Sequence, residues 1–522
     1  MTIETTDHED TFAAGLLQAD TLSELFLLRA ERSADEVGLI DERGRAVTFA
    51  QLREHTARMA AALTARGIGK GSRVAWQLPT QLNAVVVCLA LSRLGAIQAP
   101  IIAQYRQREL DASIADSQAT FLLVPGVWRG VDHVEMGRAV PTAPEVIVID
   151  DAFAESAPAL PEPPRPGGDG TEVAWVFFTS GSSGTPKGVL HSDRTLLVSA
   201  RAMVIRGRAG EDADEVVAMP FPIAHIGGPL QLMSVLMHGR KIVLFEAFAL
   251  PGSLDALRTH AVTMFGGGPA FYQALLAEQR RRPGEILLPA LRKLTGGGAP
   301  CPPNLFAEVR DELSAKLMHS YGMTECPMVC VSSPSDTDEQ LTNTEGRPVP
   351  GLEVRIWADD AIAPAGVPGE VQVRGAQTCL GYANEEHNAT AFTADGWFHT
   401  GDRAHMRADG YVEVTGRIKD LIIRKGEKIA PQELEQLLAA HPAVAEVAVV
   451  GLPDRERGER VCAVIVPRDD AAPPALPDLT DHLLRAEVMR QKLPEQLEIV
   501  AELPRRGLSK VDKVRLREQY TR

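Results

Sequence analysis

The segment FFTSGSSGTPKGVLHSDRTLL, residues 177–197, contains a loop with three glycines, five hydroxyl side chains and one lysine. The apolar run EVAWVFF, residues 172–178, is typical of a strand buried in a parallel sheet. After the loop, apolar side chains fall on one face of a predicted helix: Leu196, Leu197, Ala200, Met203 and Val204. The loop is therefore predicted to join a strand to a helix, where α/β sheets commonly bind phosphate.

The residue types of this loop suit a phosphate-binding cradle. Its glycines let backbone amides turn inward, and its hydroxyl groups and lysine add donors and positive charge. The donors are Thr179, Ser180, Ser182, Ser183, Thr185 and Lys187, accompanied by Gly181, Gly184 and Gly188. The spacing differs from a Walker A loop, because Pro186 precedes the lysine and Gly188 follows it. A flexible surface turn is the alternative, but such turns rarely lie between a buried strand and an apolar-faced helix.

The overall composition limits the class of protein. With 522 residues the chain is too long for one ordinary hydrophobic core, so two or more domains are expected. The content of 45% hydrophobic and 24% charged residues is typical of a globular enzyme, and the net charge of −15 argues against a nucleic-acid partner. We find no membrane span, no signal peptide and no disulfide framework among the six scattered cysteines. These features predict a cytoplasmic enzyme.

The pattern of apolar residues divides the chain into regions. Helical and strand-like segments alternate through the first part, which predicts two layered α/β subdomains. Short alternating strands punctuated by glycine predict a small, β-barrel-like subdomain at about residues 345–418. Residues 419–522 are typical of a compact α+β domain that could fold alone. The predicted fold class is α/β and multi-domain, with the N-terminal domain at residues 1–418.

Five motifs follow one another along the chain: TSGSSGTPKG at residues 179–188, SYGMTE at 320–325, DGWFHTGD at 395–402, GRIKDLIIRKGEKIAPQELE at 416–435 and LPRRGLSK at 503–510. Together they resemble the motifs of the adenylate-forming (ANL) superfamily, which includes acyl-CoA synthetases, luciferases and nonribosomal peptide adenylation domains. The resemblance covers nearly the whole chain. It implies that a carboxylic acid attacks the α-phosphate of ATP, giving an acyl-adenylate and pyrophosphate, and that a thiol then displaces AMP. The implied cofactors are ATP, Mg²⁺ and coenzyme A.

The resemblance also implies roles for individual residues. The loop residues that would hold the β- and γ-phosphates are Thr179, Ser180, Gly181, Ser182, Ser183, Gly184, Thr185 and Lys187. The rest of the nucleotide site would comprise Gly298, Ala299, Pro300, Ser320, Tyr321, Gly322 and Met323, with Tyr321 stacked on adenine. Thr324 would contact the α-phosphate, Glu325 and Thr179 would ligate Mg²⁺, and Asp402 and Arg417 would bind the ribose.

The same resemblance implies a mobile C-terminal domain. A hinge at Lys419 would let two sets of residues use one pocket in turn. Lys510 would act only in adenylate formation, by bridging oxygens of the substrate carboxylate and the α-phosphate. Lys425 and Gly426 would line the path of pantetheine during thiol transfer. Ser509 departs from the family, which usually has glycine before this lysine, so the backbone angles of that loop are in question.

Two segments are predicted to line the acid pocket. His225, in MPFPIAHIGGPLQLM, stands where many acyl-CoA synthetases carry a residue that gates the acyl site, although it could equally be a structural histidine. Amino-acid-activating relatives carry an aspartate in this stretch, and its absence here disfavours an α-amino acid. The glycine-rich segment LTGGGAP at residues 294–300 leaves room for a medium-chain, alicyclic or aromatic acid.

The leading prediction is an ATP-dependent carboxylic acid:CoA ligase, which is an AMP-forming acid–thiol ligase. One alternative is an acyl-AMP ligase that loads a carrier protein. Another, from a different class, is an inactive scaffold of the same fold, although the intact lysine, glutamate and aspartate positions argue against it. The predicted partners are small molecules, without nucleic acid or a membrane span, and a homodimer is left open.

Overall fold

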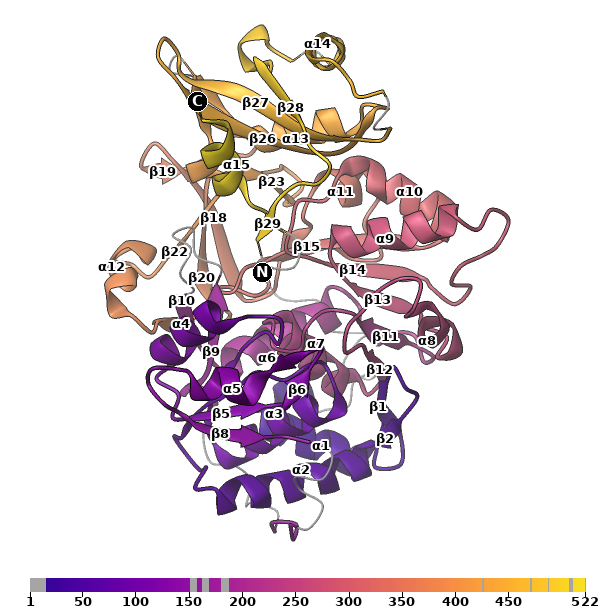
Figure 1. Cartoon of the computed structure of the whole chain (residues 1–522), viewed down its shortest axis with the longest axis vertical. Coiled ribbons are helices and arrows are strands. Elements are labelled where there is room, and N and C mark those ends of the chain that lie inside the picture. Colours follow the sequence, from indigo (N-terminus) through magenta and orange to yellow (C-terminus); the bar gives the residue numbers. More distant parts are fainter. Residues whose placement is uncertain are drawn as a thin grey trace.

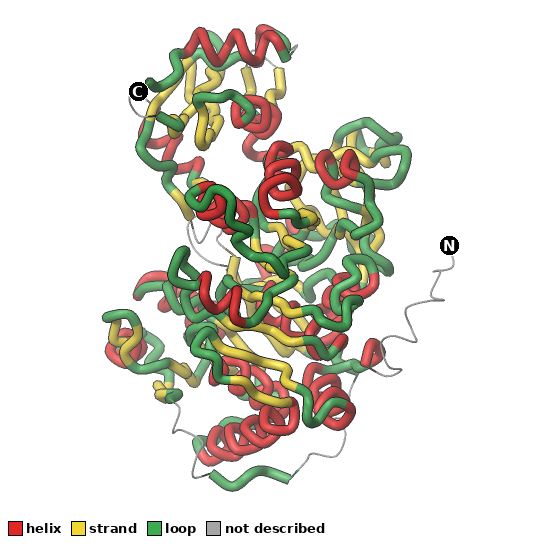
Figure 2. Tube along the Cα trace, turned by 90° about the vertical axis from the view of Figure 1, so that its right-hand side faces the viewer, coloured by secondary structure: helices red, strands yellow, loops and turns green. Residues whose placement is uncertain are grey.

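The computed structural model describes residues 16–150, 157–161, 169–179, 187–424, 427–469, 472–486, 488–506 and 510–521. Stacked sheets and helices form a large lower part, and the C-terminal region forms a smaller upper part (Figure 1). Figure 2 shows from the side that helices flank the strands in both parts. The mixed α/β fold class predicted from the sequence is confirmed.

The first sheet of the large part is mainly parallel. Its strands, in spatial order, are β21 (Gly381–Tyr382), β10 (Lys187–Ser192), β9 (Val173–Thr179), β4 (Ile97–Pro100), β3 (Arg73–Trp76), β5 (Phe121–Val124) and β8 (Glu145–Val148). Strands β3 and β5 are apolar along most of their length, because central parallel strands are covered on both faces.

The second sheet is separated from the first by a layer of helices and is also parallel through its centre. Its strands, in spatial order, are β17 (Arg347–Pro348), β16 (Cys330–Val331), β15 (Lys316–Tyr321), β14 (Lys293–Gly297), β13 (Met264–Gly267), β11 (Val216–Met219), β12 (Lys241–Leu244), β1 (Val37–Asp41) and β2 (Ala46–Thr48). The neighbours β11, β13, β14 and β15 are parallel, so their carboxyl ends lie along one edge.

Helices fill the space between these sheets and cover their outer faces. The inner helices are α1 (Leu22–Arg32), α2 (Phe49–Ala65), α3 (Leu82–Leu94), α6 (Asp193–Ile205) and α7 (Gly227–His238), which share one core with strands of both sheets. The outer face of the first sheet is covered by α4 (Gln107–Ser117) and α5 (His133–Arg138). The outer face of the second is covered by α8 (Leu254–Thr259), α9 (Pro269–Arg280) and α10 (Pro303–Leu313). This gives five alternating layers of helix and sheet.

Local sequence signals explain where these helices begin and end. Helix α2 begins with a capping box, in which the Thr48 hydroxyl accepts from Gln51 N at 3.2 Å and Gln51 Oε1 accepts from Thr48 N at 2.9 Å. Helix α3 is buried along nearly its whole length, which explains why its sequence is apolar on all sides. It ends at Gly95, whose φ of 67° suits glycine.

One sequence prediction needs correction at the glycine-rich loop. The loop was expected to lead from a strand into a helix, but β10 lies between the loop and α6. Strand β10 pairs antiparallel with β9, with Val189 opposite Phe177, so the loop connects two strands of a hairpin. The glycine and lysine at the start of β10 hide its strand character in the sequence. Residues 180–186 themselves lie outside the described residues.

The β-rich region predicted after residue 345 forms an antiparallel sheet. Its strands, in spatial order, are β19 (Ala361–Ile362), β18 (Leu352–Ala358), β20 (Gly369–Gly375), β22 (Phe398–Met406) and β23 (Val412–Arg417). Among the described residues, the end strands β19 and β23 do not pair with each other. Two short helices accompany this region, namely α11 (Asp338–Asn343) and α12 (Asn388–Ala391).

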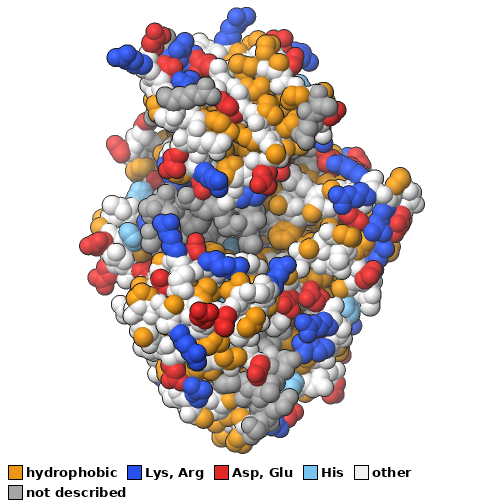
Figure 3. All heavy atoms as spheres, viewed as in Figure 1, with side chains coloured by type: hydrophobic (Ala, Val, Ile, Leu, Met, Phe, Trp, Pro, Cys, Tyr) orange, Lys and Arg blue, Asp and Glu red, His pale blue; other side chains and the backbone are white. Residues whose placement is uncertain are grey.

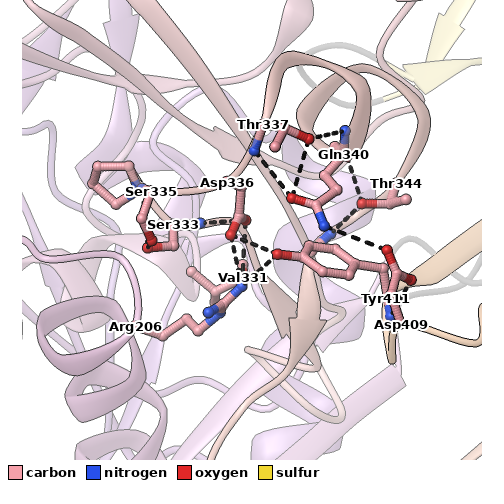
Figure 4. A network of polar contacts seen from close by, with 12 residues as sticks. Arg206, Val331, Ser333, Ser335, Asp336, Thr337, Gln340, Thr344, Asp409 and Tyr411 are labelled. Carbon is pink, nitrogen blue, oxygen red and sulfur yellow. Dashed lines mark hydrogen bonds and ion pairs between the residues drawn. The ribbon is translucent and has the colours of Figure 1, made fainter.

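A polar network fixes this antiparallel sheet to the layered part (Figure 4). Arg206, at the end of α6, donates to Val331 O at 3.1 Å and pairs with Asp336 at 3.0 Å. Tyr411, next to β23, donates to Asp336 Oδ1 at 2.7 Å. Because Asp336 is buried, these partners are needed to offset its desolvation.

The C-terminal region forms its own small sheet with helices. The strands are β24 (Ile422–Arg424), β25 (Glu427–Ile429), β26 (Val444–Asp454), β27 (Gly458–Pro467) and β28 (Gln496–Ile499), followed by the pair β29 (Arg505–Arg506) and β30 (Lys510–Val511). The helices are α13 (Pro431–Ala439), α14 (Leu476–Arg485) and α15 (Lys513–Tyr520). Helix α14 ends at Arg485, the chain turns at Ala486, and Val488 packs back into the core of this region.

Acidic and basic side chains are interspersed over the face shown in Figure 3. No helix among the described residues is long and apolar enough to cross a membrane. All six cysteines are buried and free.

Candidate active site

Part of the predicted nucleotide site, residues 298–300 and 320–323, lies at the carboxyl edge of the second sheet, where α/β sheets bind ligands. Tyr321 ends β15, and Gly298, Ala299 and Pro300 directly follow β14. A Cβ atom on Gly297 would lie 2.0 Å from Ser320 O, and one on Gly322 would lie 2.0 Å from Pro327 O. Only glycine therefore allows the backbone to pack this closely at the edge.

A buried carboxylate connects this edge to the antiparallel sheet. Asp402, on β22, accepts a hydrogen bond from Tyr321 OH at 2.7 Å through Oδ2. Its other oxygen lies 2.9 Å from Arg417 Nε, because Arg417 stands opposite it on β23. Burial raises the pKa of Asp402, although Arg417 and Tyr321 act in the opposite direction. The structure thus brings together the predicted adenine and ribose residues.

Thr324 and Glu325 are held by backbone and side-chain contacts from the first sheet. Glu325 Oε1 accepts from Tyr382 OH at 2.7 Å, and Glu325 O accepts from Cys379 N at 2.7 Å. The ring of His191 lies between Thr324 O, 2.7 Å from Nε2, and the Thr195 hydroxyl, 2.9 Å from Nδ1. A carbonyl only accepts, so Nε2 carries the proton. Burial lowers the pKa of His191 to about 4, which keeps the ring neutral.

Two of these residues, His191 and Tyr382, were not predicted from the sequence. Both lie on the strands that follow or flank the glycine-rich loop, since Val189 on β10 pairs with Tyr382 on β21. Lys187 Nζ lies 5.7 Å from the centre of the Tyr382 ring, within range of a cation–π interaction. His191 and Tyr382 matter because they contact Thr324 and Glu325, which are distant from them in sequence. Only the position of His191 near the loop could have drawn attention to it.

Lys510 reaches this site from the C-terminal region. Burial first, and then Arg417, lower its pKa, while Asp402 and Glu325 oppose the shift. Burial and the nearby Lys510 lower the pKa of His225 to about 4. Both side chains are nevertheless accessible to solvent. The structure therefore groups Lys510 with Asp402, Glu325, Arg417 and His225.

His225 also contacts the residues around it. Its Nδ1 accepts from Gly227 N at 3.2 Å, and its ring packs edge-on against Phe221 with centres 6.4 Å apart. These contacts fix the ring at the start of α7, beside the sheet edge. Its location near Lys510 suits contact with an acid, while its hydrogen bond to Gly227 also gives it a structural role.

The predicted site residues that lie outside the described residues are Ser180, Gly181, Ser182, Ser183, Gly184, Thr185, Lys425 and Gly426, and Ser509 lies outside them too. Thr179 and Lys187 stand opposite each other at the base of the loop. Lys419 lies in the short helical turn Ile418–Asp420.

The carboxylate of Glu325 suits a magnesium ion that is bound together with the nucleotide. Among the described residues no group of three or more His, Cys, Asp or Glu side chains could hold a metal alone. A single carboxylate is typical of Mg²⁺ sites in which phosphate oxygens and waters supply the other ligands. Glu325 could fill that place, with Tyr382 holding one of its oxygens.

Comparison with known proteins identifies the class. Residues 26–383 match the AMP-binding enzyme family, and residues 433–510 match the AMP-binding enzyme C-terminal domain. The chain is 30% identical to the medium-chain fatty-acid–CoA ligase of Escherichia coli, covering 97% of this chain and 92% of the relative. It is 34% identical to the salicyl-AMP ligase/salicyl-S-ArCP synthetase of Mycobacterium tuberculosis, covering 96% and 91%.

A solved structure agrees with this assignment. The o-succinylbenzoate coenzyme A synthetase of Bacillus subtilis, solved with ATP and a magnesium ion, has a TM-score of 0.82 and 28% identity, with 94% of this chain and 98% of that chain covered. The chain belongs to the AMP-binding enzyme family, within the adenylate-forming superfamily. It is an AMP-forming ligase whose chemistry uses ATP and Mg²⁺.

Proposed function

We propose that this enzyme is an ATP-dependent carboxylic acid:CoA ligase. The observation that carries the proposal is the position of Lys510, which reaches from the C-terminal region to Asp402, Glu325 and Arg417. A lysine in this place suits the first half of the reaction, in which a carboxylate oxygen attacks the α-phosphorus of ATP and pyrophosphate leaves. Both reacting groups are anionic, so a nearby ammonium group lowers the repulsion between them.

The other residues of the site support the same step. Tyr321 presents an aromatic ring for adenine, and the buried Asp402 can accept from ribose hydroxyls. The backbone of Thr324 is fixed by His191, which would keep its hydroxyl near the α-phosphate. The predicted phosphate cradle at residues 179–187 would hold the β- and γ-phosphates during this step. Mg²⁺, when bound near Glu325 and Thr179, would neutralise phosphate charge.

The second half of the reaction requires the site to change. A thiol attacks the acyl carbon, the thiol proton is lost to solvent, and AMP leaves with the electrons of the acyl–oxygen bond. We propose that the C-terminal region, residues 419–522, turns about Lys419 for this step. Lys510 then withdraws, and Lys425 and Gly426 approach the pantetheine chain.

The two substrates besides ATP are the acyl acceptor and the carboxylic acid. The name of the E. coli relative gives coenzyme A as the acyl acceptor, and we propose the same acceptor here. The name of the mycobacterial relative instead indicates transfer to a carrier protein. For the acid we propose a medium-chain, alicyclic or aromatic carboxylate, gated by His225. We further propose that the enzyme is cytoplasmic and that it forms a homodimer.

A panel of carboxylic acids, assayed for pyrophosphate release with and without coenzyme A, tests this function. We expect release that depends on an acid, followed by a thioester and AMP only when coenzyme A is present. Adenylate formation without any thioester would favour the acyl-AMP ligase. Absence of release with every acid would support the inactive scaffold.

A further inference from the structure

Asp116 lies near the end of α4, the helix that covers the outer face of the first sheet. Its carboxylate oxygen Oδ2 accepts a hydrogen bond from the backbone N–H of Gly188, 72 residues later in the sequence. Gly188 is the second residue of β10 and directly follows Lys187, the lysine of the predicted phosphate cradle. A carboxylate from a distant helix therefore holds the strand where the chain leaves the cradle. The proposed reaction so far gives this carboxylate no role.

The hydrogen bond from Gly188 N takes the place of one to a neighbouring strand. The backbone C=O of Gly188 accepts from Ala383 N at 2.8 Å, just beyond the end of β21 at Tyr382. The N–H of Gly188 bonds to the helix carboxylate instead of to a further strand residue. Hydrogen bonds to a carboxylate are stronger than those between neutral groups, and an unpaired backbone N–H is costly. The position of the start of β10 therefore depends on Asp116.

The packing around this contact explains why residue 188 is glycine. A Cβ atom there would lie 2.6 Å from Asp116 Oδ2, 3.0 Å from Val176 Cγ1 and 3.2 Å from Ala383 Cβ. The first of these distances is far below the optimal separation of non-bonded atoms. Gly188 does not have a positive φ, so glycine is required here for space and not for its backbone angles. The missing side chain of Gly188 leaves room for the carboxylate of Asp116.

Fixing the backbone of Gly188 also fixes Lys187, the residue before it. The Lys187 ammonium lies 5.7 Å from the centre of the Tyr382 ring, and Tyr382 OH donates to Glu325. The start of β10 therefore holds the lysine on the side of the site where Glu325 would bind Mg²⁺.

We propose that Asp116 is a positioning residue for the ATP-dependent half-reaction. Asp116 does not touch the nucleotide but holds Gly188 N, and thereby keeps Lys187 where it binds the β- and γ-phosphates. This inference rests on the proposed function and adds to it a residue that lies outside all five motifs. Since AMP lacks these two phosphates, Asp116 affects the binding of ATP and not that of AMP.

The test compares Asp116→Ala, which removes the acceptor, with Asp116→Asn, whose amide oxygen can still accept from Gly188 N. Binding of ATP and of AMP, each with Mg²⁺, is measured by isothermal titration calorimetry. We expect Asp116→Ala to weaken ATP binding by roughly tenfold and Asp116→Asn by less than about threefold, with AMP binding unchanged in both. Asp111→Ala is the control on the same helix, because Asp111 accepts from Gln107 Nε2 within α4.

The two half-reactions provide a second readout. With an acid that supports pyrophosphate release, Asp116→Ala should lower kcat/KM for ATP by roughly tenfold. Thioester formation from supplied acyl-adenylate and coenzyme A should keep the wild-type rate, because it does not involve the β- and γ-phosphates. In a Lys187→Met background Asp116→Ala should add little, because the side chain that Asp116 positions is then absent.

Two results would overturn the positioning role: unchanged ATP binding in Asp116→Ala, or equal weakening of ATP and AMP binding, which would show a general loss of structure. If Asp116→Ala does not fold, Gly188→Ala replaces it, since the added Cβ would displace the carboxylate. Gly188→Ala should likewise weaken ATP binding and leave AMP binding unchanged. Absence of pyrophosphate release with every acid would overturn the proposed function, whereas the comparison of ATP with AMP would still decide the role of Asp116.

Discussion

His191 is a single buried side chain that joins the strand after the glycine-rich loop to the Thr324 segment. Its pKa in the folded protein is about 4, whereas an unperturbed histidine has a pKa of 6.5. As the pH falls through this interval, the unfolded state binds a proton that the folded state does not, so acid favours unfolding. The shift corresponds to roughly 3 kcal/mol of stability, present above the unfolded pKa and lost as the pH falls to the folded one.

We expect His191→Gln to abolish the loss of unfolding free energy that protonation of His191 causes at low pH. The glutamine amide can still donate to the Thr324 carbonyl. Urea unfolding of both proteins from about pH 6.5 to about pH 4 measures the effect. The stability of the wild type relative to the variant should fall across this range. His238 is also buried with a lowered pKa, but it titrates equally in both proteins. Parallel curves would contradict the role given to His191.

Tyr382 acts on Glu325 through one hydroxyl group. Tyr382→Phe removes the donor to Glu325 Oε1 but keeps the ring beside Lys187. Because the carboxylate then loses its fixed orientation, we expect the Mg²⁺ concentration for half-maximal adenylation to rise roughly tenfold. A titration of pyrophosphate release with Mg²⁺ measures this, and Tm reports any general loss of structure. An unchanged Mg²⁺ dependence would show that Tyr382 does not position Glu325.

At the level of strands and helices, the sequence predicts long apolar elements well. The runs that form β9 and α3 are recognisable because central strands and buried helices must be apolar. Strands β10 and β21 were missed, since β10 begins with lysine and glycine and β21 has only two residues. Their pairing places Tyr382 beside Lys187, which no local pattern indicates. The side chains that contact the site residues were therefore harder to predict from the sequence than the motifs that carry the site residues.

Strands β14 and β15 approach each other so closely that one pair of residues requires glycine. Gly297→Ala would place a Cβ atom 2.0 Å from Ser320 O, opposite it in the sheet. We expect a loss of roughly 2–3 kcal/mol of stability, because backbone atoms cannot yield as side chains do. Thermal or urea unfolding measures it, with Gly69→Ala as control, since its Cβ would meet nothing within 4 Å. Equal stability of both variants would contradict this packing.

Across the whole molecule, the small and large parts meet at α13 and β23. Gln432 Nε2 donates to Val414 O at 3.2 Å, which favours the arrangement that places Lys510 in the site. We expect Gln432→Leu to slow adenylation severalfold, because the loss of roughly 1 kcal/mol shifts the population away from this arrangement. Acyl-adenylate and coenzyme A, supplied together, should still react at the wild-type rate. Glu433→Gln, which breaks only an ion pair to Lys492 within the small part, is the control.

Lys510 is the residue on which movement between the two parts should depend most. It interacts with Asp402 and Glu325 in the arrangement described here, so removing its charge leaves the attacking carboxylate and the α-phosphate without a shared cation. We expect Lys510→Ala to lower adenylate formation by roughly a hundredfold or more. Thioester formation from a supplied acyl-adenylate should be preserved, because Lys510 is proposed to leave the site for that step. Single-turnover assays of each half-reaction measure the two effects.

Lys513→Ala, which loses only an ion pair to Glu435, is the control and should retain both half-reactions. An equal loss of both half-reactions in Lys510→Ala would rule out a domain rotation between adenylate formation and thioester formation.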